Sequence, residues 1–279
     1  MPILMYAAEI WGFNVNPCLE QVQISYCKFV LRVPTSTSNA AVLGECGRSP
    51  LAVKCTLKVI NFWLKLLNMD VNRLPKSCYE MLFNLDKIGR KTWASEVKNI
   101  LYKFGYGIVW FEQGVGDSAV FVRAFEQRVT DCYTQSWHSD CMKNNKLNMY
   151  TNIKSLLEPE KYLTCVTNTK FKSSLARFRC SSHKLAIETG RWTNTEAAER
   201  ICILCANHGE VFIESEYHFL LVCLTYRELR DKFIPKYYHI HPDNAKFISL
   251  LKSDNEKVVT NLAKYVHFAS KLREKIITV

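Results

Sequence analysis

Apolar side chains recur every three or four residues along most of the chain, the spacing of one face of an α-helix. A helix is expected to begin at Pro17, because proline suits the first helical position. The apolar positions that follow at this spacing are Leu19, Val22, Tyr26, Phe29 and Val30. Strand-like alternation is rare and short, so the pattern predicts a mainly α protein.

Residues that begin or end helices divide the rest of the pattern. A polar loop at residues 32–38 ends in Ser38, which is expected to cap a short helix at 39–45. Gly47 is expected to end that helix, and Pro50 to start the next. A loop is expected at 68–76. Further helices are expected at 79–85, 95–104, 117–143, 147–157, 162–166, 216–233, 245–251 and 256–276, with a basic helix and turn at 171–187.

The length and composition of the chain are consistent with one large folded domain or two of average size. The 279 residues are 48% hydrophobic, enough for a sizeable core, and the 10 Gly and 8 Pro are few for a turn-rich all-β protein. The formal net charge is +11, from 37 Lys and Arg against 26 Asp and Glu. This excess favours a polyanionic partner, either nucleic acid or an acidic membrane, without choosing between them.

The chain is predicted to be intracellular and soluble, with no membrane partner. Its 12 Cys are scattered through a large apolar sequence, so most are expected to be reduced core residues. Residues 1–15 lack the pattern of a signal peptide, and no uncharged apolar run reaches the ~18–20 residues that span a bilayer. The apolar opening at residues 2–11 is expected of a segment cut from a larger protein.

A Cys-x2-Cys-x12-His-x4-Cys array is the sharpest chemical signal in the sequence. Its members are Cys202, Cys205, His218 and Cys223. Two thiolates separated by two residues can bind one ion from a tight turn, and a later His and Cys complete a tetrahedral shell. This ligand set is typical of structural Zn²⁺, because no coordination position is left open for catalysis.

The last two residues of the array impose a condition on the backbone. His218 and Cys223 would lie about 140° apart on a regular helix of 3.6 residues per turn. Joint binding therefore requires a distorted turn or a helix that starts late. His208, three residues after Cys205, is a competing fourth ligand. The alternative without metal is a pair of core cysteines, an unrelated buried Cys223 and a surface histidine.

A strongly basic segment at residues 170–192 precedes the array, with six cations against Glu188, a net charge of +5. The six cations, predicted to contact phosphates of RNA or DNA, are Lys170, Lys172, Arg177, Arg179, Lys184 and Arg191. The interleaved rings of Phe171, Phe178 and Trp192 can stack on unpaired bases, but packing in the core is their expected role. A solvated helix face is the alternative for the charges.

No catalytic site is predicted. Two-metal polymerase chemistry requires clustered carboxylates, whereas the sequence has no Asp-Asp pair, and Asp131, Asp140 and Asp231 stand isolated. The GVGD segment at residues 114–117 lacks the Lys and the Ser or Thr of a phosphate-binding loop. No local signature marks a Cys/His nucleophile pair. The chain is therefore not expected to be an enzyme on its own.

Several segments resemble the carboxy-terminal part of the reverse transcriptase polyprotein of non-LTR retrotransposons. Residues 2–12 (PILMYAAEIWG) are similar to the stretch after the polymerase palm, and residues 28–34 and 43–51 (KFVLRVP and LGECGRSPL) are similar to its thumb. Residues 178–179 (FR), 183–185 (HKL) and 188–192 (ETGRW) resemble the basic segment before the terminal zinc knuckle. The residues that match the knuckle itself are Arg200, Ile201, Cys202, Cys205, Glu216, His218, Phe219, Leu220 and Cys223.

The resemblance covers nearly the whole chain in order, with two departures. Ala7 stands where Gly is usual, and Cys46 replaces an apolar residue. The fingers and the palm with its catalytic Asp pair are absent, as is an endonuclease. The resemblance implies a truncated retrotransposon product: a non-catalytic tail that binds RNA and DNA and positions template or target for a palm that this chain lacks.

Together these signals predict four regions. They are a thumb-like helical region at residues 1–105, a helical linker and basic segment at 106–192, a CCHC zinc-knuckle region at 193–235 and C-terminal helices at 236–279. A break between two halves is expected at 104–116, which holds four Gly. Two other functions stay open: a protein-interaction module in which zinc merely joins helices, and a non-functional fragment that folds poorly without its palm.

Overall fold

The computed structural model describes residues 3–277, and over these residues the chain is mainly helical with no β-strand. The prediction of a mainly α protein is therefore confirmed. Two isolated antiparallel bridges occur in this part of the chain, Cys46 with Pro159 and Ile201 with Ile213. None of its helices combines the length and the apolar character needed to cross a lipid bilayer.

The chain divides into two compact units. The first comprises Met1–Gln23 and Ser49–Ser136, and the second comprises Ile24–Arg48 and Trp137–Val279. The boundaries fall inside α2 (Pro17–Leu31), inside α8 (Ser118–Lys143) and just after α3 (Asn39–Glu45), and not in the glycine-rich segment at 104–116. Because each unit joins segments that are distant in sequence, the units do not coincide with the four regions predicted from the linear pattern.

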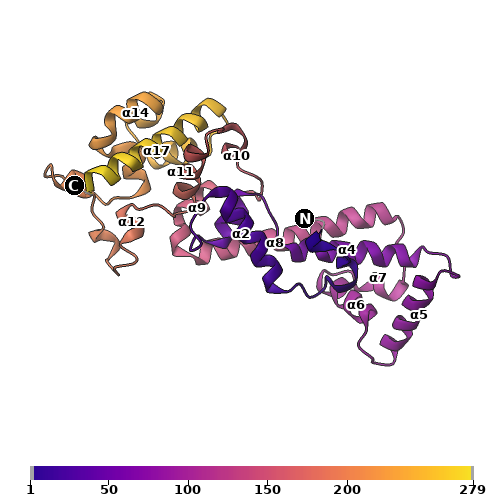
Figure 1. Ribbon diagram of the computed structural model, residues 1–279. Helices are drawn as coiled ribbons and strands as arrows, with labels where there is room; N and C mark the ends of the chain where they lie inside the picture. Colours follow the sequence, from indigo (N-terminus) through magenta and orange to yellow (C-terminus); the bar gives the residue numbers. More distant parts are fainter. Residues whose placement is uncertain (1–2, 278–279) are drawn as a thin grey trace. The chain divides into compact units, whose positions relative to one another are not determined.

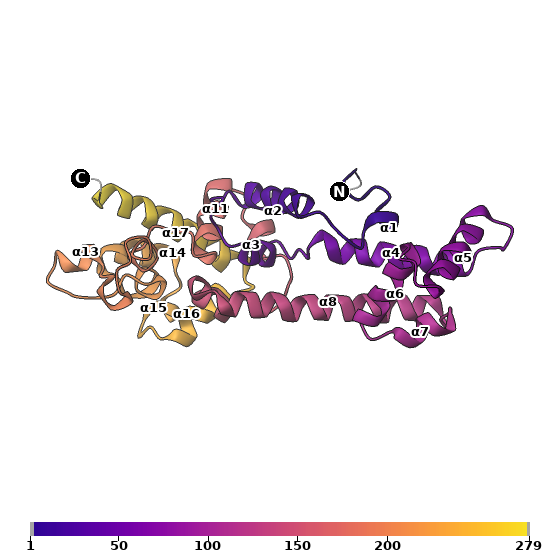
Figure 2. The same cartoon turned by 90° about the horizontal axis from the view of Figure 1, so that it is seen from below.

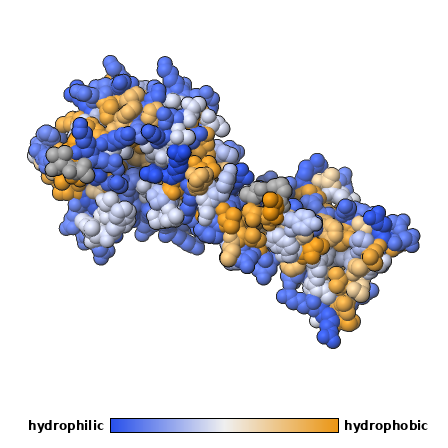
Figure 3. Space-filling view, viewed as in Figure 1, coloured by the Kyte–Doolittle hydropathy of each residue, from blue (hydrophilic) through white to orange (hydrophobic). Residues whose placement is uncertain are grey.

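The first unit packs helices around Trp63, whose Nε1 donates a hydrogen bond to the Tyr79 hydroxyl at 2.9 Å. Its elements are η1 (Ile3–Met5), α1 (Ala8–Trp11), the start of α2, α4 (Leu51–Leu67), α5 (Leu74–Lys87), α6 (Trp93–Lys103), α7 (Gly107–Glu112) and most of α8 (Figure 1). Ile3, Tyr6 and Ile10 are exposed, and Figure 3 shows apolar residues gathered beside the described amino end.

The second unit packs around Phe219, whose ring centroid lies 5.7 Å from that of Phe178, 5.0 Å from Tyr226 and 5.9 Å from Tyr265. Its first elements are the rest of α2, α3, the end of α8, η2 (Asn145–Leu147), α9 (Asn148–Ile153), α10 (Tyr162–Cys165), α11 (Thr169–Arg179), α12 (Ala186–Thr189) and η3 (Ala197–Glu199). The later ones are α13 (Ile203–Ala206), η4 (His218–Val222), η5 (Leu224–Tyr226), α14 (Arg227–Phe233), α15 (Lys236–His239), α16 (Asn244–Leu251) and α17 (Glu256–Ile277). Helix α17, yellow in Figures 1 and 2, packs along α11.

Most predicted helices are present, and three segments differ. Helix α5 begins at Leu74, inside the expected loop at 68–76, because Pro75 in its first turn favours an earlier start. Helix α7 forms within the expected break at 104–116 despite starting at Gly107. The single helix expected at 216–233 is wrong, since a π-helix, a 3-10 helix and α14 take its place.

Gly44 allows α3 to approach aromatic side chains that are distant in sequence. A Cβ atom here would overlap the Tyr150 hydroxyl and lie 2.6 Å from a ring carbon of Trp137. Both aromatic groups donate hydrogen bonds to α3 carbonyl oxygens, at 3.1 and 2.8 Å respectively. We expect Gly44→Ala to destabilise the fold by about 1–3 kcal/mol, the cost of overpacking. Urea unfolding measures this loss, and Gly116→Ala, whose Cβ would meet open space, is the control that should change stability little.

Candidate metal centre and basic groove

Cys202, Cys205, His218 and Cys223 meet in one buried group within the second unit. Their sulfur and nitrogen ligand atoms all lie within 4.8 Å of one another. Cys205 Sγ is 3.4 Å from His218 Nε2 and 3.6 Å from Cys223 Sγ. Tetrahedral bonds of about 2.3 Å to sulfur and about 2.0 Å to nitrogen would place these pairs about 3.5 and 3.8 Å apart. The group can therefore hold a metal ion.

A widened turn brings His218 and Cys223 to the same side. The segment η4 is a π-helix, and Cys223 N donates a hydrogen bond to His218 O at 2.8 Å, across five residues. Of the two arrangements predicted from the sequence, a distorted turn or a helix that starts late, the structure shows the distorted turn. Cys223 then adopts an extended ψ of 122°, which interrupts the helical backbone. Bringing the two side chains together is what prevents residues 216–233 from forming one helix.

Cys202 and Cys205 lie on a tight turn that reverses the chain. Glu210 N donates a hydrogen bond to Cys205 O at 3.1 Å. Gly209 adopts a φ of 80°, a left-handed conformation that suits glycine. The side chain of His208 in this turn is exposed and lies outside the group of four, which leaves the later histidine as the fourth member.

Burial and hydrogen bonds among the three thiols shift their pKa values in different directions. The contact with Cys223, together with burial, raises the pKa of Cys202 to about 12. The same contact lowers the pKa of Cys223, whereas burial raises the pKa of Cys205. A metal ion must displace the protons that remain, so metal binding by this group weakens as the pH falls.

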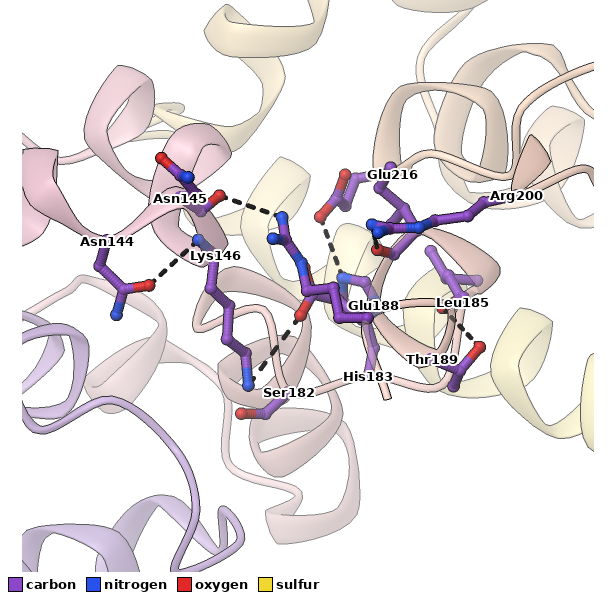
Figure 4. Close-up of polar contacts among 12 residues, drawn as sticks. Asn144, Asn145, Lys146, Ser182, His183, Leu185, Glu188, Thr189, Arg200 and Glu216 are labelled. Atoms are coloured by element: carbon purple, nitrogen blue, oxygen red, sulfur yellow. Dashed lines mark hydrogen bonds and ion pairs between the residues drawn. The ribbon is translucent and has the colours of Figure 1, made fainter. Parts of the chain in front are cut away.

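Two carboxylates connect the loop at residues 200–217 to the helices of the second unit. This loop carries Cys202 and Cys205 of the candidate metal group and is here called the metal-bearing loop. Glu214 accepts two hydrogen bonds from Arg273, at 2.6 and 2.7 Å, and one from Ala186 N at 2.6 Å. Glu216 pairs with His183 Nε2 at 3.2 Å, as Figure 4 shows. Arg273 and His183 also line the adjacent cavity, so the loop supports the wall of that cavity.

A cavity of about 550 Å³, here called the basic groove, opens among α11, α12, α17 and the loop at 32–36 of the second unit. Seven Lys and Arg side chains line it, against the two carboxylates of Glu188 and Glu274. Carboxylates engage three of the cations, Lys146, Lys184 and Arg273. The four without an ion pair among the described residues are Arg32, Lys170, Arg177 and Lys271. The groove thus presents uncompensated positive charge.

Three of the six cations predicted to contact phosphate line the basic groove: Lys170, Arg177 and Lys184. Of these three, Lys184 also pairs with Glu274, and Arg177 Nε donates a hydrogen bond to Arg32 O at 2.9 Å. Two of the other predicted cations also contact protein groups. Lys172 Nζ donates a hydrogen bond to Leu163 O at 2.7 Å, and Arg191 Nε pairs with Glu188 at 3.2 Å. Neither lines the groove.

Arg179 requires a correction. Its side chain is buried, and its guanidinium pairs with Glu45 at 2.9 Å and Glu160 at 2.8 Å. It therefore cannot reach a phosphate. The partners belong to segments far from the basic segment, and no local pattern around Arg179 indicates them.

Several residues of the groove were not predicted from the sequence. Lys146, Lys271 and Arg273 lie outside residues 170–192 and belong to no motif, so the net charge of the whole chain is the only signal that includes them. Arg32 lies in the thumb-like segment at 28–34, which gives no sign of a groove. The expected core role is confirmed for Phe178, at 1% exposed, and Phe171 is half-buried. For Trp192 it is wrong, because this ring is 75% exposed.

No protein-family model, no curated protein and no solved structure matches the chain. The metal group and the basic groove therefore carry the case for its function.

Proposed function

We propose that this chain is a zinc-stabilised nucleic-acid-binding segment of a non-LTR retrotransposon reverse transcriptase, without polymerase activity of its own. The observation that carries the proposal is the basic groove, where four cations without ion pairs among residues 3–277 converge. Such cations release counterions when they bind the phosphates of a nucleic acid. The sequence resemblance of residues 178–192 and of the Cys/His array to the basic segment and zinc knuckle of these polyproteins supports the same assignment.

Zn²⁺ is the proposed metal. Three thiolates and one imidazole form a closed tetrahedral set that suits this ion and leaves no position for a substrate. The ion would hold the loop that carries Glu214 and Glu216, and these carboxylates bind Arg273 and His183 in the wall of the groove. The role of the metal is therefore structural.

Removing three cations from the groove should weaken nucleic-acid binding and reduce its salt dependence. We expect the triple variant Lys170→Ala/Arg177→Ala/Lys271→Ala to lower the slope of log K against log salt by about 2 for a single strand, because each phosphate contact contributes ~0.7. Fluorescence anisotropy with RNA and DNA oligonucleotides over about 0.05–0.2 M salt measures both affinity and slope.

The matched control removes the same charge from exposed positions outside the groove, as Lys232→Ala/Lys236→Ala/Lys257→Ala. It should change the slope much less than the groove variant does. If the salt slope falls equally in the control variant and in the groove variant, binding depends on the overall charge of the chain and not on the groove. Weak, salt-insensitive retention by the wild type would favour a protein-interaction module, and rapid limited proteolysis of the wild type would favour a poorly folded fragment.

A further inference from the structure

Trp192 is the one exposed tryptophan of the described residues, and its side chain lines the basic groove. An indole is a large apolar group that a folded chain normally buries. Phe178, from the same basic segment, is buried in this way. The side chain of Trp192 is instead largely exposed, at a surface where Lys170, Arg177 and Lys271 supply positive charge.

The turn that carries Trp192 is fixed by Arg200. This side chain donates hydrogen bonds to Ile187 O at 2.7 Å and to Thr195 O at 2.8 and 3.0 Å. It also fills the space beside Gly190, where any Cβ atom would lie 2.7 Å from its carbon atoms. A fixed backbone presents the indole without the ordering cost of a flexible loop.

We propose that the basic groove binds a single-stranded segment of nucleic acid, with one unpaired base stacked on the Trp192 indole and phosphates on the flanking cations. A positively charged groove combined with an aromatic platform is the arrangement by which proteins hold single strands. In a duplex, neighbouring pairs cover the faces of the bases, so the indole has nothing to stack on. The inference rests on the proposed nucleic-acid function and adds the class of ligand and a residue that recognises it.

Trp192→Ala in the full chain should lower the affinity for a single-stranded oligonucleotide by about 5- to 150-fold, the range for loss of one base–aromatic stack. The salt slope should stay unchanged, because no phosphate contact is removed. Trp192→Phe should retain most of the affinity, and binding of a duplex of the same sequence should not respond to either change. Anisotropy measures the affinities, and the single strand should quench tryptophan emission in the wild type but not in Trp192→Ala.

Tyr237→Ala is the matched control, because this ring is 67% exposed in the same unit and does not line the groove. It should bind like the wild type. If Trp192→Ala binds the single strand as tightly as the wild type while the triple groove variant binds weakly, base stacking is overturned and nucleic-acid binding stands. An equal loss of duplex affinity in Trp192→Ala would overturn the assignment to single strands. If the wild type binds neither nucleic acid, both proposals fail.

Discussion

Removing the metal ion is expected to unfold the loop that bears it. Structural zinc supplies about 10–16 kcal/mol of apparent binding free energy in zinc-finger peptides, and this energy is folding free energy. The metal-bearing loop has little core of its own, since five of its apolar side chains are exposed. They are Ile201, Ile203, Val211, Phe212 and Ile213. Without the ion, the loop would depend on a few hydrogen bonds and the two carboxylate contacts.

Metal content and thermal unfolding test this expectation directly. A strong chelator should lower the Tm and make the loop susceptible to proteolysis. Mass spectrometry should find zinc in the wild type but not in Cys205→Ser, which lacks one thiolate. Cys165→Ser is the matched control, because Cys165 is a half-buried thiol of the same unit outside the metal group. Cys165→Ser should keep both the metal and the Tm of the wild type. Wild-type protein that is fully folded but contains no metal would contradict the prediction.

Chelation should also weaken nucleic-acid binding, although no metal ligand lines the groove. The physical link is the pair of carboxylates on the loop: Glu214 holds Arg273, and Glu216 holds His183. When the loop unfolds, both groove residues lose the partners that position them. Undiminished binding by the chelated protein would show that the groove keeps its shape without the metal.

The helices and the members of the Cys/His group could be predicted because both follow local spacing. The apolar repeat depends on neighbours three or four residues away, and the array depends on the turn at Cys202 and Cys205. Even the distortion between His218 and Cys223 followed from geometry, since a regular helix would separate the two side chains. The apolar spacing predicted a single helix at 216–233 and gave no sign that η4, η5 and α14 would take its place.

The groove could not be predicted, because its residues come together only when the second unit folds. Arg32 precedes α3 and Lys271 lies on the last helix, yet both line the cavity with Lys170 of α11. In addition, the sequence of the basic segment alone predicts that every one of its cations is exposed. Whether Arg179 faces solvent or Trp192 faces the core depends on side chains contributed by other segments.

Arg179→Ala should cost about 3–5 kcal/mol of folding free energy, because it leaves a buried carboxylate without its partner. Arg179 donates to Glu45 at 2.9 and 3.2 Å, and Glu45 is 0% exposed. Its other contacts are Glu160 at 2.8 Å and Leu251 O at 2.7 Å. Burial alone would lower the pKa of Arg179, but Glu45 and Glu160 raise it above its usual value, so the guanidinium stays charged.

Urea unfolding of single and double variants separates the loss of the pair from the loss of one partner. Arg179→Met/Glu45→Met removes both charges and should recover much of the stability that Arg179→Ala loses, because apolar residues of similar volume often replace a buried ion pair at little cost. Arg179→Lys keeps the charge without the planar fork that contacts three acceptors, so its stability should be intermediate. If the double variant is as unstable as Arg179→Ala, the lost folding free energy comes from packing and not from the unpaired charge of Glu45.

Arg177→Ala is the matched control with the opposite expected outcome. Arg177 lies two residues earlier on α11, is exposed and lines the groove. Its loss should change stability by no more than about 0.5 kcal/mol, as for most surface substitutions, while single-strand affinity falls. Arg179→Ala, assayed where it is still folded, should keep the affinity of the wild type. If Arg179→Ala instead binds the single strand more weakly at unchanged stability, Arg179 contacts phosphate, as predicted from the basic segment.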